Sequence, residues 1–172
     1  MRRWNYERDQ EVPEEKRRRR TGGRTLAVRP QFPLDEIYIT LFSERRVYAP
    51  DGTIHYEPIP QRAADTGVEL LDDLRRMLSE GKSNLKTFGE GYGLTPSDVN
   101  GLVLALTGME AITFRIAWQM RRADELLRYT DLSIEEVARQ SGVGSTTNLF
   151  YACHRDFHCS PSQRRRHLRQ AN

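Results

Sequence analysis

The most constraining feature of the sequence is a pair of short helices predicted on either side of a glycine turn, in the last third of the chain. Ser133 stands at the N-cap of the first helix, and Glu136 follows three residues later, where it can close a capping box. Leu132 and Val137 are spaced to form a hydrophobic staple over this cap. Gly142 then permits the left-handed backbone with which a helix commonly ends. The pattern predicts a helix-turn-helix.

The second helix of this motif is predicted over residues 146–155, and its first turn is polar. In a helix-turn-helix, the N-terminal residues of the second helix meet base edges in the DNA major groove. Hydroxyl and amide groups can hydrogen-bond there, and threonine methyl groups can contact thymine methyls. The candidate DNA-contacting residues on this helix are Ser145, Thr146, Thr147, Asn148 and Tyr151. DNA binding is therefore the first function to consider.

These residues resemble the second helix-turn-helix of the AraC/XylS family of bacterial transcription regulators. The matching positions are Arg121 or Arg122, Ala123, Leu126, Leu127, Leu132, Ser133, Ile134, Glu136, Val137, Ala138, Gly142, Ser145, Ser160 and Pro161. Val143 and Leu149 stand where the family usually has Phe. The resemblance extends more weakly back to about Asp65. It implies a mainly α-helical domain of two helix-turn-helix subdomains joined by a long helix, and a bacterial sequence-specific DNA-binding regulator.

The chain divides by charge into two basic ends and an acidic middle. Residues 1–30 hold ten Lys and Arg against five Asp and Glu, residues 31–110 hold seven against thirteen, and residues 111–172 hold ten against six. A polyanion would be attracted to the ends. We expect a basic mobile arm over residues 1–30, which either contacts DNA or is a solvated tail. A β-hairpin segment over 31–64 and an AraC-like domain over 65–172 complete the predicted organisation.

Coarse periodicity fills in these regions. Residues 36–42 are rich in β-forming side chains, and a Pro50-Asp51-Gly52 turn separates two further short apolar runs, so we predict one hairpin over 36–59. Such a hairpin must pack on the helices or on another chain, because an isolated one is marginal in water. The predicted helices are residues 66–80 with a Thr66–Glu69 capping box, residues 96–107, and residues 110–129 with an apolar stripe of Ile112, Ile116, Met120, Ala123 and Leu127. The last is about 30 Å long.

The first helix-turn-helix is predicted to be weaker than the second. Counting along the motif places Phe88 at the position of Ala138, and three glycines at 89, 91 and 93 each cost close to 1 kcal/mol in a helix interior. The second helix of this motif offers Ser97 and Asn100 to DNA but no Lys or Arg. Asn100 could read adenine. The alternative, which we favour, is that this motif packs or dimerises without reading DNA.

Basic residues after the second motif have two interpretations. Arg155, Arg164, Arg165, Arg166 and Arg169 either follow the DNA backbone, where they give salt-sensitive affinity, or form a solvated helix face. The expected partner is double-stranded DNA. A homodimer, RNA polymerase or another regulator are further candidate partners. The alternative functions are a degenerate protein-interaction module and a sequence-independent DNA-coating module.

Other classes of chemistry find little support. Cys153, His154, His158 and Cys159 are zinc-ligand types. However, adjacent Cys and His residues on one helix point in different directions, and Cys153 falls at an apolar family position, so we expect it to face the core. No metal, no cofactor and no enzyme activity are predicted. No run of eighteen apolar residues exists, the N-terminus is too polar for a signal peptide, and two cysteines suit a reducing cytoplasm, with the nucleoid as the expected location.

Overall fold

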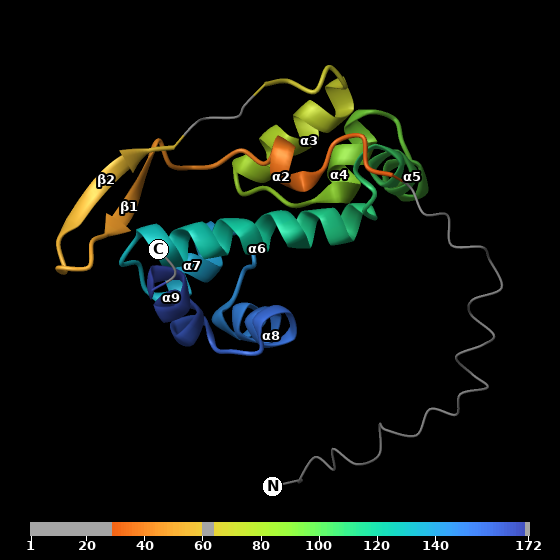
Figure 1. The fold of residues 1–172 in the computed structure, drawn as a ribbon. Coiled ribbons are helices and arrows are strands. Elements are labelled where there is room, and N and C mark those ends of the chain that lie inside the picture. Colours follow the sequence, from red (N-terminus) through yellow and green to blue (C-terminus); the bar gives the residue numbers. More distant parts are fainter. Residues whose placement is uncertain (1–28, 60–63, 171–172) are drawn as a thin grey trace, which may run out of the picture.

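The computed structural model describes residues 29–59 and 64–170, so that the predicted basic arm of residues 1–30 lies almost entirely outside the described residues. The central element is the long helix α6 (Ala111–Tyr129), and the other elements are arranged along it (Figure 1). They are α2 (Leu34–Ile37), β1 (Glu44–Tyr48), β2 (Ile54–Pro58), α3 (Glu69–Ser79), α4 (Leu85–Gly91), α5 (Pro96–Thr107), α7 (Ile134–Gln140), α8 (Thr146–Phe157) and α9 (Pro161–Gln170). This is the predicted mainly helical fold with a short hairpin.

Two hydrophobic cores lie along α6. The first core contains Phe114 and Trp118 of α6 with buried residues of α3 and α5. The second core contains Ala123 and Leu127 of α6 with buried residues of α7 and α8. Both cores bury α6, so this helix fixes the position of one helix-turn-helix relative to the other.

The predicted stripe on α6 is partly wrong. Met120, Ala123 and Leu127 are buried as expected, but the side chain of Ile112 is 58% exposed. The residues that instead face the first core are Ala111, Phe114 and Trp118. Because the two cores cover different sides of α6, a single stripe cannot describe its buried surface.

Local sequence signals explain most helix ends. Thr95 and Asp98 form a reciprocal capping box around Pro96 at the start of α5, and Gly108 ends the helix with a φ of 73°. The prediction of a helix over 96–107 is confirmed. The start of α3 was predicted wrongly, because no bond joins Thr66 to Glu69 and the N-cap is Val68.

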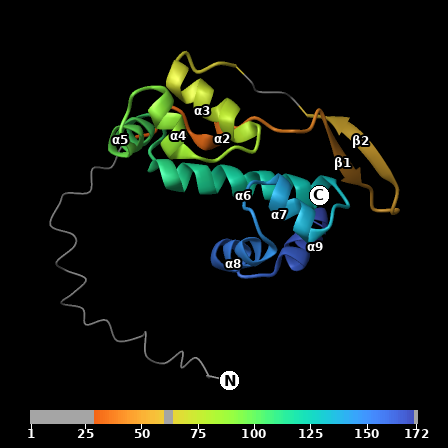
Figure 2. The ribbon, with the colours of Figure 1, turned by 180° about the vertical axis from the view of Figure 1, so that it is seen from behind.

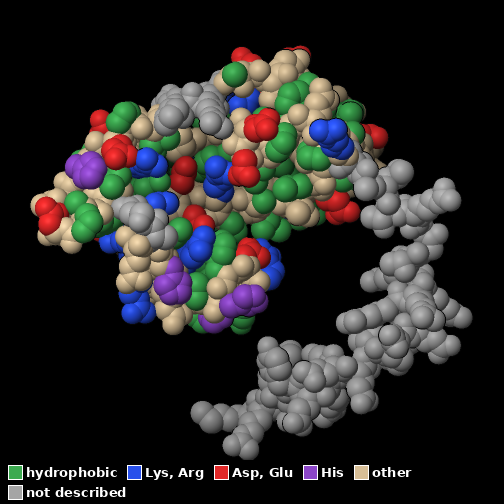
Figure 3. Space-filling view, in the orientation of Figure 1, with side chains coloured by type: hydrophobic (Ala, Val, Ile, Leu, Met, Phe, Trp, Pro, Cys, Tyr) green, Lys and Arg blue, Asp and Glu red, His purple; other side chains and the backbone are tan. Residues whose placement is uncertain are grey.

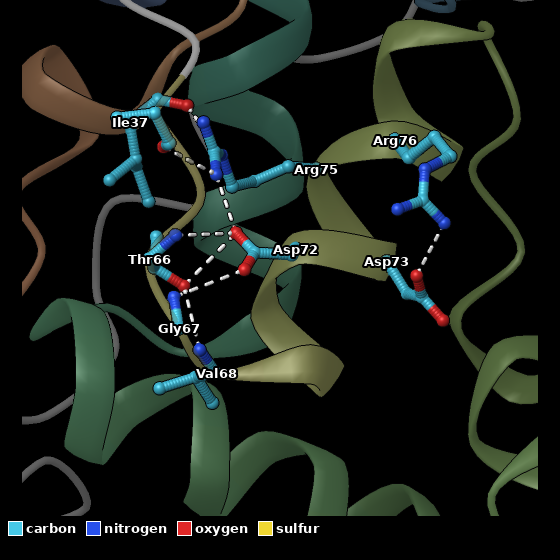
Figure 4. A network of polar contacts seen from close by, with 9 residues as sticks. Ile37, Thr66, Gly67, Val68, Asp72, Asp73, Arg75 and Arg76 are labelled. Carbon is cyan, nitrogen blue, oxygen red and sulfur yellow. Dashed lines mark hydrogen bonds and ion pairs between the residues drawn. The ribbon is translucent and has the colours of Figure 1, made fainter.

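At that start, the carboxylate of Asp72, in the first turn of α3, binds the segment that precedes the helix. Asp72 accepts a hydrogen bond from the backbone N–H of Thr66 at 2.9 Å (Figure 4). The fully buried Arg75 bonds to the same carboxylate at 2.5 Å and donates from Nε to the carbonyl of Ile37 at 2.8 Å. This network ties α3 to the N-terminal segment, which a count of helix-capping residues does not reveal.

The N-terminal segment was predicted only in part. The hairpin exists, but its strands are β1 and β2, whereas residues 36–42 contribute the end of α2 and an extended stretch instead of a strand. This stretch runs alongside α6, and the ring of Tyr38 packs on that of Trp118 with centroids 4.8 Å apart. Burial of this aromatic ring outweighs the strand propensity of the sequence.

The hairpin packs on the helices, as it must to be stable. Arg46 of β1 donates to Asp131, just beyond the end of α6, at 2.9 Å.

Among the described residues, no single helix is long and apolar enough to cross a membrane, although α5 and α6, bent by 61°, meet the criteria of length and composition as a pair.

Candidate nucleic-acid interface

The second helix-turn-helix is held in place by capping and by a glycine turn. Ser133 Oγ accepts a hydrogen bond from the N–H of Glu136 at 3.1 Å, but Glu136 does not reach back, because its carboxylate bonds to Arg139 and Gln140. These bonds, that to Arg139 first, lower the pKa of Glu136 to about 2. The turn has left-handed backbone at Gly142, with a φ of 82°. The N-cap at Ser133 and the left-handed Gly142 are confirmed, but the reciprocal bond of the predicted capping box is not formed.

The position of α8 is set by contacts on both sides of this turn. Gln119 of α6 donates to the carbonyl of Gly142 at 2.7 Å, and the N–H of Gly144 donates to the carbonyl of Ala138 at 2.9 Å. Ser145 Oγ then accepts from the N–H of Asn148 at 3.1 Å and so caps α8. The N-terminus of α8 is therefore fixed to the long helix through a short turn that is hydrogen-bonded at Gly142 and Gly144.

One face of α8 is buried and the other is open to solvent. Leu149 and Cys153 are fully buried in the second core. The first turn is exposed at Thr146, Thr147 and Asn148, and the predicted Tyr151 is 68% exposed one turn later. The polar first turn is thus presented outward by a helix whose opposite face is anchored. Such a rigid presentation is what base reading requires.

The first motif is built differently from the prediction. Its turn is one residue shorter, so that Gly89 and not Phe88 occupies the helix-crossing position corresponding to Ala138. A Cβ added to Gly89 would lie 2.9 Å from Val99 Cγ2 and 3.1 Å from the carbonyl oxygen of Leu94. Gly89 therefore allows α4 and α5 to approach closely, and α4 is a regular helix of seven residues, as long as α7.

The second helix of the first motif, α5, carries no cation on its exposed face. Ser97 and Asp98 are exposed, but Asp98 is occupied by the capping box with Thr95. Asn100 is turned toward α6, where its Oδ1 accepts the N–H of Ala111 at 2.9 Å. Leu102 is 42% exposed. Residues 64–110, which include α5, contain eight Asp and Glu against four Lys and Arg, so the net charge of this subdomain disfavours contact with phosphate.

Comparison with known proteins identifies the fold. A family model described as a helix-turn-helix domain matches residues 88–167. The DNA-binding domain of AdpA, a global transcriptional factor solved in complex with a target DNA, is similar at 23% identity and a TM-score of 0.54, over 62% of this chain and 96% of that one. Residues 88–167 are an AraC/XylS-type helix-turn-helix domain.

Two other solved structures resemble this AraC/XylS-type domain. The C-terminal domain of AraT, a response regulator from Geobacillus stearothermophilus, has 22% identity and a TM-score of 0.53, over 60% of this chain and 88% of that one. The C-terminal domain of the two-component response regulator yesN from Fusobacterium nucleatum has 18% identity and a TM-score of 0.51, over 56% and 93%. No curated protein matches the chain. At these identities the likeness concerns the fold.

Most arginines of α9 are used inside the AraC/XylS-type domain. Arg164 makes a two-point contact with Asp124 of α6, at 3.0 and 2.5 Å, and lies 3.6 Å over the ring of Phe157. Arg165 donates to the carbonyl of Leu132, and Arg169 donates to that of Thr130 at 2.6 Å. These side chains hold α9 against the loop between α6 and α7.

Two other arginines of this domain have freer guanidinium groups. Arg155 is exposed at the end of α8 and pairs with the neighbouring Asp156 at 2.6 Å. Arg166 is exposed and makes no hydrogen bond or ion pair with any of the residues that the structure describes. If α9 contacts a phosphate, Arg166 is the side chain that can do so without breaking an internal bond.

Phe150 and His154 lie on the outward face of α8 but were not among the predicted DNA-contacting residues. Phe150 is 44% exposed, and its ring lies 4.4 Å from that of His154, which is also exposed. Figure 3 shows histidine side chains on the lower lobe of the molecule, where α8 and α9 lie. The spacing of Phe150 and His154 from Thr147 along one helix face was the available signal.

The cysteines and histidines of this lobe do not form a metal site. Within residues 29–59 and 64–170, no group of three or more His, Cys, Asp or Glu side chains is placed to hold a metal ion. Cys153 faces the core as predicted, and burial raises the pKa of its thiol to about 11.

Proposed function

We propose that this chain is a bacterial sequence-specific DNA-binding transcriptional regulator in which α8 is the main base-reading helix. The observation that carries this proposal is the exposed polar first turn of α8, with Thr146, Thr147 and Asn148 held outward by the capped and hydrogen-bonded turn that precedes them. The AdpA domain of similar fold was solved with a target DNA. Duplex DNA in the bacterial nucleoid is the proposed partner.

The first motif contributes little to base reading in this proposal. Asn100 is engaged with α6, and α5 lies in a subdomain with an excess of four acidic side chains, eight against four. The helix α6 has 19 residues and spans about 28 Å, close to the 34 Å of one duplex turn. Thus α5 has the spacing of a second reading helix but lacks the charge and the free polar groups.

Phosphate contacts in this proposal come from few side chains. Arg155 and Arg166 are exposed near α8 and α9, whereas Arg164 and Arg165 hold the domain together. Each phosphate contact changes the slope of log affinity against log salt by about −0.9. A small slope is therefore expected from one subunit, and useful affinity requires a second subunit, a partner such as RNA polymerase, or the basic N-terminal arm.

The exposed apolar side chains of the first motif favour a second candidate, a protein-interaction module. Leu102 of α5 is 42% exposed and Ile112 of α6 is 58% exposed. Duplex binding distinguishes the candidates when it is measured over a series of salt concentrations with competitor duplexes of different sequence. A base-reading protein loses affinity log-linearly with salt and keeps a sequence preference. A DNA-coating protein shows the slope without the preference, and an interaction module shows no preference at any salt.

A further inference from the structure

The outer edge of the hairpin is an unpaired strand. The hairpin projects past the helices at the C-terminal end of α6, with β2 on the outer side in both views (Figures 1 and 2). Its sheet has two strands, so no described residue pairs with the outer edge of β2. The hairpin is tied to the helical part by β1, where Arg46 donates to Asp131, just beyond α6, at 2.9 Å. An edge of this kind is a template for another strand.

The register shows which backbone groups point outward. The N–H of Ile59 donates to Ser43 at 2.8 Å, and the N–H of Ala49 donates to Thr53 at 2.9 Å. Hydrogen-bonded pairs alternate along an antiparallel ladder. The pairs Arg45–Glu57 and Val47–His55 are therefore bonded within the hairpin.

The other residues of β2 direct their backbone groups to the open edge. These residues are Ile54, Tyr56 and Pro58. Pro58 has no N–H, so the edge offers two donors, those of Ile54 and Tyr56, and three carbonyl acceptors.

This edge is complementary to itself. When two β2 strands pair antiparallel about Tyr56, each Tyr56 N–H meets the carbonyl of the other Tyr56. Each Ile54 N–H meets the carbonyl of Pro58 in the other copy. Four backbone hydrogen bonds form, and every outward donor of β2 is used. Because the missing N–H of Pro58 lies opposite Ile54, no donor is left unpaired.

The side chains agree with the same register. Ile54 and Tyr56, which are 50% and 60% exposed, lie on one face of the strand, so that the two tyrosine rings meet across the new pair. On the other face His55 lies opposite Glu57 of the second copy. Glu57 is already oriented by Arg45 at 2.7 Å and by His55 of its own strand at 3.4 Å, and the bond to Arg45 lowers the pKa of its carboxyl group further. A positive charge at residue 55 of the second copy would stabilise the pairing with this carboxylate.

We propose that the chain forms a homodimer through antiparallel pairing of its β2 strands into a four-stranded sheet. Five residues from each copy bury less than the roughly 800 Å² per partner of a standard interface, so the dimer is weak and reversible. The pairing itself does not depend on what α8 binds. Its use, to bring two α8 helices to one stretch of DNA, rests on the proposed function.

Sedimentation equilibrium of the full chain without DNA tests this proposal. The average mass should rise reversibly with concentration from 20.0 kDa toward twice that value. Tyr56→Pro removes the central N–H, which the hairpin itself does not use, and should remain at 20.0 kDa at every concentration. Tyr56→Phe, the matched control, keeps the N–H and the ring and should associate like the unaltered chain.

A pair of charge variants decides the question if Tyr56→Pro fails to fold. His55→Glu places two like charges opposite each other twice in the dimer, and His55→Lys places two opposite charges. From the usual strength of cross-strand pairs, the first should raise the dissociation constant about 2- to 30-fold and the second should lower it over a similar range.

Several results would overturn the β2 dimer. They are a chain that stays monomeric at every soluble concentration, equal association of Tyr56→Pro and Tyr56→Phe, or a dissociation constant that is the same whatever the charge at residue 55. Loss of association in Leu102→Glu but not in Tyr56→Pro would place the interface on α5 instead. Asn148→Ala should leave the mass unchanged, so failure of DNA reading and failure of dimerisation are observed separately.

Discussion

Asn100→Ala and Asn148→Ala should have opposite effects on stability and on DNA binding. Asn100 Oδ1 accepts the N–H of Ala111, the first residue of α6, at 2.9 Å. The first N–H groups of a helix have no partner within it. Removal of this oxygen should therefore lower the unfolding free energy by about 0.5–2 kcal/mol, as the loss of a helix cap does. Because this amide faces α6, DNA affinity should stay within experimental error.

Asn148 should behave in the reverse way. Its side chain is exposed and makes one long bond of 3.3 Å to the carbonyl of Val143. Asn148→Ala should therefore change the unfolding free energy by less than about 0.5 kcal/mol, as surface substitutions commonly do. If this amide reads a base, the variant should lose about 1–3 kcal/mol of preference at one base pair.

Urea unfolding and a binding profile over single-base variants of one duplex give both quantities for each protein. Asn100→Asp is the control, because it keeps an acceptor oxygen at the start of α6 and should recover most of the stability. A large loss of DNA affinity in Asn100→Ala, in a variant that is still folded, would refute the assignment of Asn100 to the α5–α6 contact alone. An unchanged profile for Asn148→Ala would refute base reading by Asn148.

Three further predictions follow from the packing. Gly89→Ala should lower the unfolding free energy by about 1–2 kcal/mol, because the added Cβ would meet Val99. Gly91→Ala, whose Cβ would have no atom within 4 Å, should raise it by about 0.5 kcal/mol. Equal effects of the two variants in urea unfolding would contradict the close approach of α4 to α5. Arg164→Lys should lower the unfolding free energy by about 1–2 kcal/mol, because it loses the two-point contact with Asp124. Arg166→Ala should leave the unfolding free energy unchanged and reduce the salt slope of duplex binding by about 1. A reduced salt slope in Arg164→Lys but not in Arg166→Ala would assign the phosphate contact to Arg164. The carboxylate of Glu136 has a pKa of about 2 against an ordinary 4.5, so it stabilises the fold above pH 4.5 and loses this contribution as the pH falls through 2. Glu136→Gln should therefore reduce the change in unfolding free energy between pH 4.5 and pH 2, measured by urea unfolding. If the variant keeps the same dependence on pH, the bond to Arg139 is not the cause.

The second motif could be predicted closely because its signals are local. Ser133, Gly142 and Ser145 act within a few residues of themselves, and each has the predicted role. Thr95 and Gly108 act in the same local way at the two ends of α5. Capping oxygens and left-handed glycines satisfy backbone groups nearby, so they can be recognised without knowledge of the remaining fold.

The errors arose where a residue is determined by a distant partner. Tyr38 lies in a segment with strand propensity, yet it packs on Trp118 of α6 and its hydroxyl donates to Glu125 at 2.8 Å. Asn100 has the form of a DNA-contacting residue, and its bond to Ala111 depends on the crossing of two helices. Arg164 looks like part of a solvated or DNA-facing run, and only the fold brings Asp124 to it.

Selection from a random duplex library at about 150 mM salt tests the central claim most directly, that α8 reads DNA and α5 does not. If α8 alone reads bases, one short motif is enriched, either singly or as an inverted repeat of itself, and Asn148→Ala loses the preference at one base pair of that motif. Two different half-sites about ten base pairs apart would mean that α5 also reads bases. No enrichment at all would contradict the assignment of α8 as a base-reading helix.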